Sequence, residues 1–167
     1  MRHTIAILVE DHPGVMARVA SLFTRRGFNI ESIAVGHSEK EGISRMTIIV
    51  SGDEQVLEQI TKQLNKLVDV IRVRDILPSH MIERELVLVK VKTDSIANRS
   101  EVIQLVEIYQ AKVVDVEHKG MTIEISGSED KVNGLLALLE PFGILEIVRT
   151  GRIALSRGKN TVHSKNK

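Results

Sequence analysis

The chain has 167 residues and a formal net charge of +1; 43% of its residues are hydrophobic, 2% are aromatic and none is cysteine. This composition predicts one or two small domains with aliphatic cores, and it excludes disulfides, thiolate metal sites and cysteine catalysis, as expected for a cytoplasmic protein. The last twelve residues carry four basic side chains and no acidic one, so the net charge of the remaining residues is about −3. A basic nucleic-acid-binding domain is therefore excluded.

Hydrophobic periodicity predicts a strand, a helix and a second strand at the start of the chain. Alternating isoleucine and valine residues over 5–9 indicate the first strand. The helix that follows is expected to end at Gly27, which can take the left-handed conformation of a C-cap. A strand over 29–37 comes next. We expect the helix to bury one face made of Val15, Met16, Val19, Leu22 and Phe23.

The next three elements complete the order β-α-β-β-α-β, which is that of a ferredoxin-like unit. The third strand is expected to show Arg45 and Thr47 on its solvent side. Asp53 can cap the second helix, and three valines over 68–73 predict the fourth strand. The buried residues expected in the third strand and second helix are Met46, Ile48, Val50, Val56, Leu57, Ile60, Leu64 and Leu67.

The second half of the chain repeats this order. The segment Thr47–Glu54 resembles Thr122–Glu129 at an offset of 75 residues. A tandem duplication and the convergence of two strand-turn-helix junctions explain this likeness equally well, and both predict two similar domains. The expected strands cover 85–92, 112–117, 121–125 and 145–148, and the expected helices cover 100–109 and 132–139.

The domain boundary is predicted near Pro78, because proline cannot extend a central strand. We therefore predict an α+β protein built from two tandem ferredoxin-like βαββαβ domains. The first covers residues 1–78 and the second covers residues 79–158. A basic flexible tail over 159–167 is expected to follow them.

The sequence contains no recognisable catalytic, metal-binding or nucleic-acid-binding motif. The six histidines lack metal-ligand spacing, and neither a nucleophile elbow nor a glycine-rich phosphate loop occurs. The strand over 46–49 lacks the aromatic residues that stack bases in RNA-binding domains of this fold. No apolar run approaches the ~20 residues of a membrane helix, and residues 4–9 read as a strand rather than as part of a signal peptide. We expect no catalytic residue, metal or cofactor in this chain, and no nucleic-acid or membrane partner.

The segment Glu10–Val15, which joins the first strand to the first helix, is a candidate ligand site. Free N–H groups at a helix start attract anions, and Gly14 lets a ligand approach the backbone closely. Asn29 follows the same helix and offers a carboxamide that can accept a hydrogen bond from an ammonium group or donate one to a carboxylate. These features would suit a small apolar amino acid, although a tight turn and an ordinary strand start explain the same residues.

The residues Val9–Val15 together with Gly27–Ser32 resemble an ACT domain, the amino-acid-sensing module. More narrowly, several segments resemble the small subunit of acetohydroxyacid synthase, also called acetolactate synthase. That resemblance extends over nearly the whole chain. Its segments are 26–32, 44–48, 63–70, 83–86 and 154–158.

The resemblance implies a regulatory subunit that controls a large catalytic subunit and has no catalytic activity of its own. In that family the first domain binds valine, or a related branched-chain amino acid, between two ACT domains, which implies a homodimer. Thiamine diphosphate, FAD and magnesium belong to the large subunit, and none is expected in this chain. Gly14 and Asn29 match family residues implicated in inhibitor binding, whereas Asp11 stands where many relatives have asparagine. The ligand-binding residues so implied are Asp11, Pro13, Gly14, Val15, Asn29 and Ile30.

Two other classes of function remain open. A free-standing ACT-type sensor that regulates another partner, such as a transcription factor, has the same fold but is not favoured by the resemblance over the whole length. A small ferredoxin-like hydrolase would need a cluster of acid, base and oxyanion-binding groups, which the sequence does not contain.

Overall fold

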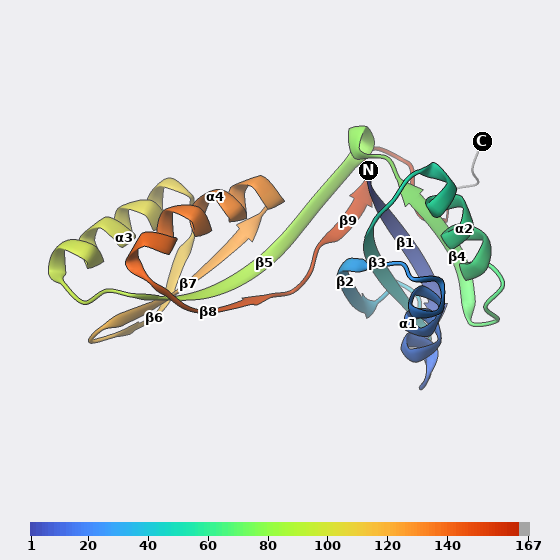
Figure 1. The fold of residues 1–167 in the computed structure, drawn as a ribbon, viewed down its shortest axis with the longest axis horizontal. Coiled ribbons are helices and arrows are strands. Elements are labelled where there is room, and N and C mark those ends of the chain that lie inside the picture. The colour runs from blue at the N-terminus through green and yellow to red at the C-terminus, as the bar shows by residue number, and fades with distance from the viewer. Residues whose placement is uncertain (164–167) are drawn as a thin grey trace. The chain divides into compact units, whose positions relative to one another are not determined.

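In the computed structural model, which describes residues 1–163, the chain divides into two compact units (Figure 1). Unit 1 contains Met1–Ile82 and the segment that begins at Arg152, and unit 2 contains Glu83–Gly151. Unit 2 is therefore an insertion within unit 1. This division differs from the predicted domains, because the residues after 151 belong with the first unit rather than the second.

Unit 1 contains a four-stranded antiparallel sheet with the strand order β2-β3-β1-β4. This order is the one that a ferredoxin-like βαββαβ chain produces. The predicted α+β class and the ferredoxin-like first unit are confirmed. The elements are β1 (Arg2–Glu10), α1 (Val15–Arg26), β2 (Ile30–His37), β3 (Ile43–Ser51), α2 (Glu54–Leu64) and β4 (Val70–Ile76), followed by the short 3-10 helix η1 (Pro78–His80).

Both helices of unit 1 pack on one face of its sheet through a single hydrophobic core. Gly27 ends α1 in the left-handed conformation, and the Asp53 carboxylate accepts a 2.8 Å hydrogen bond from the Val56 N–H at the start of α2, both as predicted. Two apolar residues that the sequence assigned to elements of unit 1, Met16 and Val68, do not reach this core. Met16 is 41% exposed, because it follows the buried Val15 by 100° around the helix. Val68 is 94% exposed in the turn that precedes β4.

The second face of the unit 1 sheet is covered by the C-terminal segment. A second cluster of buried residues joins Ala6 and Leu8 of β1 to Ala154 and Val162. Arg45 extends from β3 and donates a 2.7 Å hydrogen bond to the Ala154 carbonyl. Because this segment covers the face, the prediction that Thr47 faces solvent is wrong.

The covering segment contains the short strand β9 (Ile153–Ser156), which the sequence did not predict and which pairs with β5. Beyond it, the Nε2 atom of His163 lies 2.6 Å from Glu39 Oε1, and Arg72 donates to the His163 carbonyl at 2.9 Å. Residues 159–163 of the predicted flexible tail therefore pack against unit 1. Residues 164–167 lie outside the described part of the chain.

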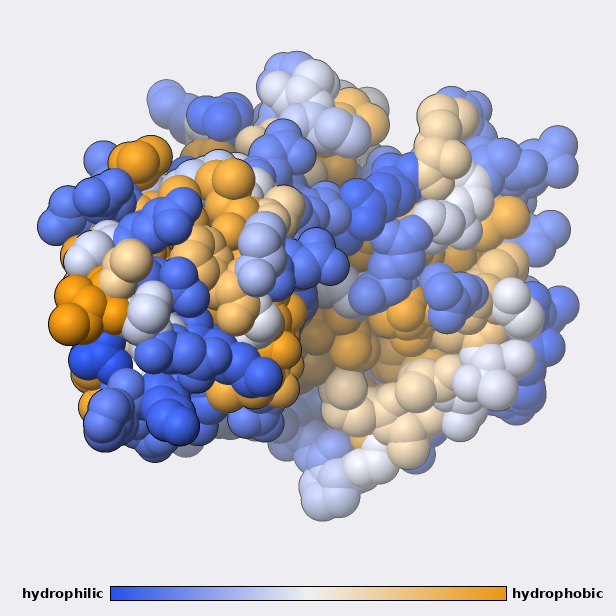
Figure 2. Space-filling model, turned by 60° about the vertical axis from the view of Figure 1, so that its left-hand side comes forward, coloured by the Kyte–Doolittle hydropathy of each residue, from blue (hydrophilic) through white to orange (hydrophobic). Residues whose placement is uncertain are grey.

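Unit 2 repeats the architecture, with the strand order β6-β7-β5-β8 and both helices on one face. The molecular surface mixes hydrophilic and hydrophobic residues (Figure 2). The exposed aliphatic side chains of unit 2 include Ile96, Ile108 and Val148. None of the helices described in either unit has the length and apolar composition needed to cross a membrane. The elements are β5 (Met81–Lys92), α3 (Ile96–Ile108), β6 (Lys112–Glu117), β7 (Gly120–Gly127), α4 (Glu129–Leu139), η2 (Glu140–Phe142) and β8 (Ile144–Arg149).

The repeated sequence segments occupy equivalent positions in the two units. Each spans the end of the third strand of its unit and the start of the following helix, which is capped by Asp53 in one unit and by Ser128 in the other. A Cβ atom on Gly52 or Gly127 would lie 2.6 Å from the side chain four residues later. Each glycine therefore lets the strand approach the first turn of its helix closely.

Candidate functional site

The segment between β1 and α1 presents an uncapped helix start to solvent. Gly14 occupies the N-cap position with a φ of 91°, and no side chain accepts a hydrogen bond from the first turn of α1. Only glycine adopts this backbone conformation without a steric penalty. Asp11, His12, Pro13 and Gly14 are all exposed. The Val15 N–H donates a long hydrogen bond of 3.5 Å to the His12 carbonyl. The other N–H groups of the first turn and the positive end of the helix dipole can receive an anion such as a carboxylate.

Backbone hydrogen bonds from two other connections hold this loop in place. The Glu10 N–H donates to the Asp69 carbonyl and the Asp11 N–H donates to the Gly42 carbonyl, each at 2.9 Å. The Asp11 carboxylate lies 3.1 Å from His37 Nδ1 at the end of β2. The loop therefore lies beside the last residue of the edge strand β2, which the sequence alone did not indicate.

A carboxylate from another part of the chain supports the helix start. Asp69 is buried, with one oxygen 2.9 Å from His12 Nε2 and the other 2.6 Å from Arg18 Nε. Within the described residues, Glu10, His12 and Asp69 also place ligand atoms within 4.8 Å of one another, as a metal site would. Since Arg18 already compensates the charge of Asp69, we interpret this group as an ion-pair network that fixes the loop.

Val15 differs from the other residues of the predicted site. Its side chain is buried in the core of unit 1 and its N–H donates to the His12 carbonyl at 3.5 Å, so its side chain is not available to a ligand. Ile30 is partly buried and packs against the same core. A hollow of about 660 Å³ lies along the outer surface of α1; its lining consists of Ala17, Arg18, Ala20, Ser21, Thr24 and Arg25, and it includes none of the predicted residues.

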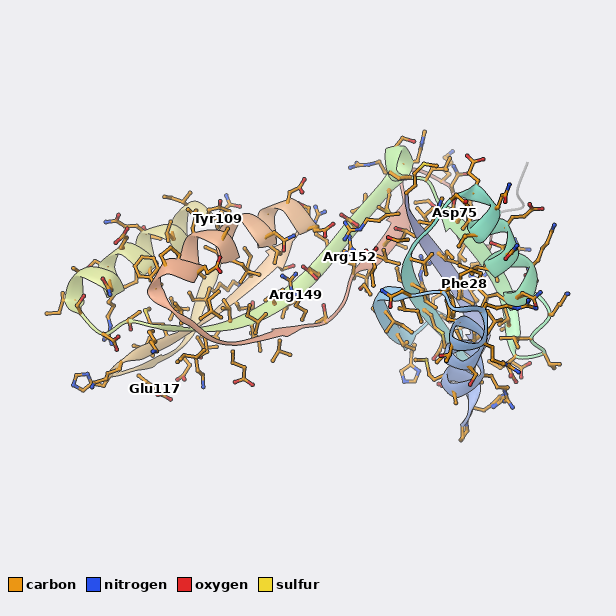
Figure 3. The ribbon with its side chains drawn as sticks, in the orientation of Figure 1. Phe28, Asp75, Tyr109, Glu117, Arg149 and Arg152 are labelled. Carbon is orange, nitrogen blue, oxygen red and sulfur yellow. The ribbon has the colours of Figure 1, made fainter. Side chains whose placement is uncertain are left out.

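Asn29 lies at the opposite end of α1 from Gly14. It is exposed and directly follows Phe28, whose N–H donates to the Phe23 carbonyl at the end of the helix (Figure 3). A helix of 12 residues is about 18 Å long, which is far more than the length of a small amino acid. Within one chain, the structure therefore does not bring Gly14 and Asn29 into one pocket.

Comparisons with known proteins give a consistent result for both units. Residues 84–158 match the family described as the small subunit of acetolactate synthase, and residues 5–72 match the AHAS small subunit-like ACT domain. The two matches together span nearly all of the described chain.

Named relatives cover almost the full length. The chain is 56% identical over 160 residues to a probable acetolactate synthase small subunit from Methanothermobacter thermautotrophicus, which covers 96% of this chain and 95% of the relative. It is 53% identical to the acetolactate synthase small subunit of Mycobacterium bovis, over 93% of this chain and 92% of the relative. The crystal structure of the acetolactate synthase small subunit from Thermotoga maritima matches with a TM-score of 0.89 and 46% sequence identity. The match covers 96% of this chain and 99% of the Thermotoga chain.

Proposed function

Because the chain belongs to the acetolactate synthase small-subunit family, we propose that it raises the activity of a large catalytic subunit and makes it sensitive to valine or a related branched-chain amino acid. The large subunit would supply the thiamine diphosphate, FAD and magnesium. The observation that carries the proposal is the exposed, uncapped start of α1 at Gly14, placed in a unit of the ACT type. It can bind a carboxylate group by its backbone.

The ligand site would be completed by a second copy of the chain. The strand β2 lies at an edge of the unit 1 sheet, so its outer hydrogen-bonding groups can pair with another strand. In an antiparallel pair of two β2 strands, the start of one strand lies beside the end of the other. That pairing would place Asn29 of one copy near His37 and the Asp11 loop of its partner.

This arrangement assigns complementary roles to the two copies. The α1 start of one copy would receive the ligand carboxylate, and the carboxamide of Asn29 from the other would bind a polar group of the same ligand. Ile30 and neighbouring aliphatic residues would contact its apolar side chain. The exposed Asp11 carboxylate can pair with the ligand ammonium group.

The chain is expected to form a homodimer through β2. Sedimentation equilibrium at micromolar concentration should show a dimer for the wild type. Changing Val35, an exposed residue of β2, to proline removes a backbone donor at the pairing edge and should give mostly monomer. Val116→Pro on β6 is the matched control, since it changes an exposed valine of an edge strand in the other unit. A wild type that stays monomeric with and without valine would contradict the proposal.

The test of function is a valine titration of the large subunit reconstituted with this chain, with thiamine diphosphate, FAD and magnesium present. We expect the chain to raise acetolactate formation, to form none by itself, and to confer inhibition by valine. Asn29→Ala should weaken inhibition roughly tenfold or more, because a hydrogen bond to a charged ligand contributes about 1.5–3 kcal/mol. Activation should be retained, since Asn29 is exposed and not part of the core.

The outcomes separate the proposal from its alternative. A chain that binds valine but leaves the activity of the large subunit unchanged would indicate a free-standing sensor of another partner. Unchanged inhibition of Asn29→Ala would place the ligand elsewhere in the molecule. Turnover by the pure chain would contradict the regulatory function itself.

A further inference from the structure

The polypeptide passes from unit 1 to unit 2 and back, and the return occurs at Arg152 (Figure 3). The preceding residue, Gly151, has a φ of 81°, a conformation that favours glycine. Arg152 is 8% exposed although it carries a charge. A buried arginine at a chain crossing requires specific partners, because an unpaired charge there would be strongly destabilising.

Arg152 is bound by two consecutive residues of β2. Its backbone N–H donates a 2.9 Å hydrogen bond to Ser32 Oγ, and its Nη2 atom lies 3.9 Å from Glu31 Oε2. All three residues belong to unit 1. The first residue after the insertion is therefore attached to the edge strand by its backbone and its side chain together.

Glu31 also connects this attachment to two further strands. Its carboxylate accepts hydrogen bonds from Ser51 Oγ at the end of β3 and from Arg2 Nε at the start of β1, the latter at 2.7 Å. The hydrogen bond from Ser51, then the hydrogen bond and charge of Arg2 and the charge of Arg152, lower the pKa of Glu31. Glu31 is therefore an anion at neutral pH and holds both arginines.

The register of β2 against β3 shifts between Ile30 and Ser32, which leaves Glu31 in an irregularity of the ladder. Such irregularities redirect side chains and allow a strand to bend locally. Asn29 and Ile30, which we assign to the ligand site, directly precede this point. Asn29 and Ile30 therefore adjoin Glu31 and Ser32, the two residues to which Arg152 is bound.

We propose that Arg152 is a positioning residue that couples ligand occupancy at Asn29 and Ile30 to unit 2, through its attachment to Glu31 and Ser32. The inference rests on the proposed function, because it assumes that the ligand contacts Asn29. Binding of the ligand would favour one arrangement of the start of β2, and Arg152 would convey this preference to the covalently attached unit. Linkage requires that unit 2, when held by its partner, alters ligand affinity by the same factor.

The experiment measures ligand binding and inhibition separately. Valine affinity is measured by calorimetry on the isolated chain, and inhibition is measured on the enzyme reconstituted with the large subunit. For Arg152→Gln and Ser32→Ala we expect valine affinity within about threefold of wild type, and maximal inhibition reduced at least fivefold. Ser32→Thr retains the hydroxyl acceptor and should restore inhibition. Arg157→Gln removes a different contact of the C-terminal segment, to the Met81 carbonyl, and should behave as wild type.

The possible results are distinct. Full inhibition with both Arg152→Gln and Ser32→Ala would overturn the coupling role while the proposed function stands. Loss of valine binding in either variant would also overturn it, because the residue would then support the pocket itself. A failure of Ser32→Thr to restore inhibition would overturn the assigned hydrogen bond. A wild type that neither binds valine nor confers inhibition would contradict the proposed function and, with it, this inference.

Discussion

Gly14→Asp is expected to raise the valine concentration for half-inhibition of the reconstituted enzyme by tenfold or more, while activation of the large subunit is retained. The new carboxylate would stand at the uncapped start of α1, where it competes with the carboxylate of the ligand and repels it. A Cβ atom on residue 14 would lie 3.9 Å from Arg18 Nη2. The introduced charge could therefore also draw Arg18 away from Asp69, to which it is now paired.

Gly14→Asn is the matched control, because asparagine has the same shape and tolerates a positive φ at least as well as aspartate. A large difference between the two variants would assign the effect to charge. Equal resistance would assign it to the bulk of the side chain near the backbone N–H groups. Inhibition equal to wild type in both variants would contradict the assignment of the site to the start of α1.

Ala154→Asp is expected to destabilise unit 1 by about 3 kcal/mol or more, because it buries a carboxylate against Ala6 and Leu8. For a unit of this size such a loss lowers Tm by roughly 10 °C or more. Thermal unfolding followed by circular dichroism measures the change. The expected size of the effect depends on the C-terminal segment lying on the second face of the sheet in solution.

The adjacent residue gives an internal control. Leu155 is 59% exposed whereas Ala154 is 5% exposed, so Leu155→Asp introduces the same carboxylate into the same short strand on its solvent side. We expect it to change Tm by no more than a few degrees. A similar decrease in Tm for the two variants would mean that a charge destabilises this strand on either side, and not only where it covers the sheet. Unchanged stability of Ala154→Asp would contradict the covered face directly.

Local sequence signals were sufficient for most of the regular structure. Helical spacing located the two helices of unit 1, and the capping roles of Gly27 and Asp53 followed from their chemistry alone. Errors occurred where tertiary contacts decide the outcome. Thr47 has a polar side chain in an alternating strand, which ordinarily indicates a solvated face. It is buried because a segment more than 100 residues later in the chain covers it, and no local pattern contains that information.

In the candidate site, too, local features could be predicted from the sequence, whereas contacts between distant segments could not. The glycine-containing turn before α1 could be recognised as an anion-binding helix start from its sequence. Its supports could not, because Asp69 and Gly42 come from distant connections whose approach depends on the completed sheet. The sequence did place Asn29 after the predicted end of the first helix at Gly27, at the opposite end from Gly14. No local pattern indicates what could bring these two ends of the helix to one ligand.

The inserted position of unit 2 has a consequence for the order in which the protein matures on the ribosome. Strands β1–β4 are synthesised first, yet the residues that cover Ala6 and Leu8 are translated after residues 83–151. At the roughly 5–20 residues per second typical of translation, the synthesis of residues 83–151 takes about 4–14 seconds, and the covering segment is made only after it. During that interval the nascent chain carries an open aliphatic surface, so translation products that stop within unit 2 should be prone to aggregation and degradation.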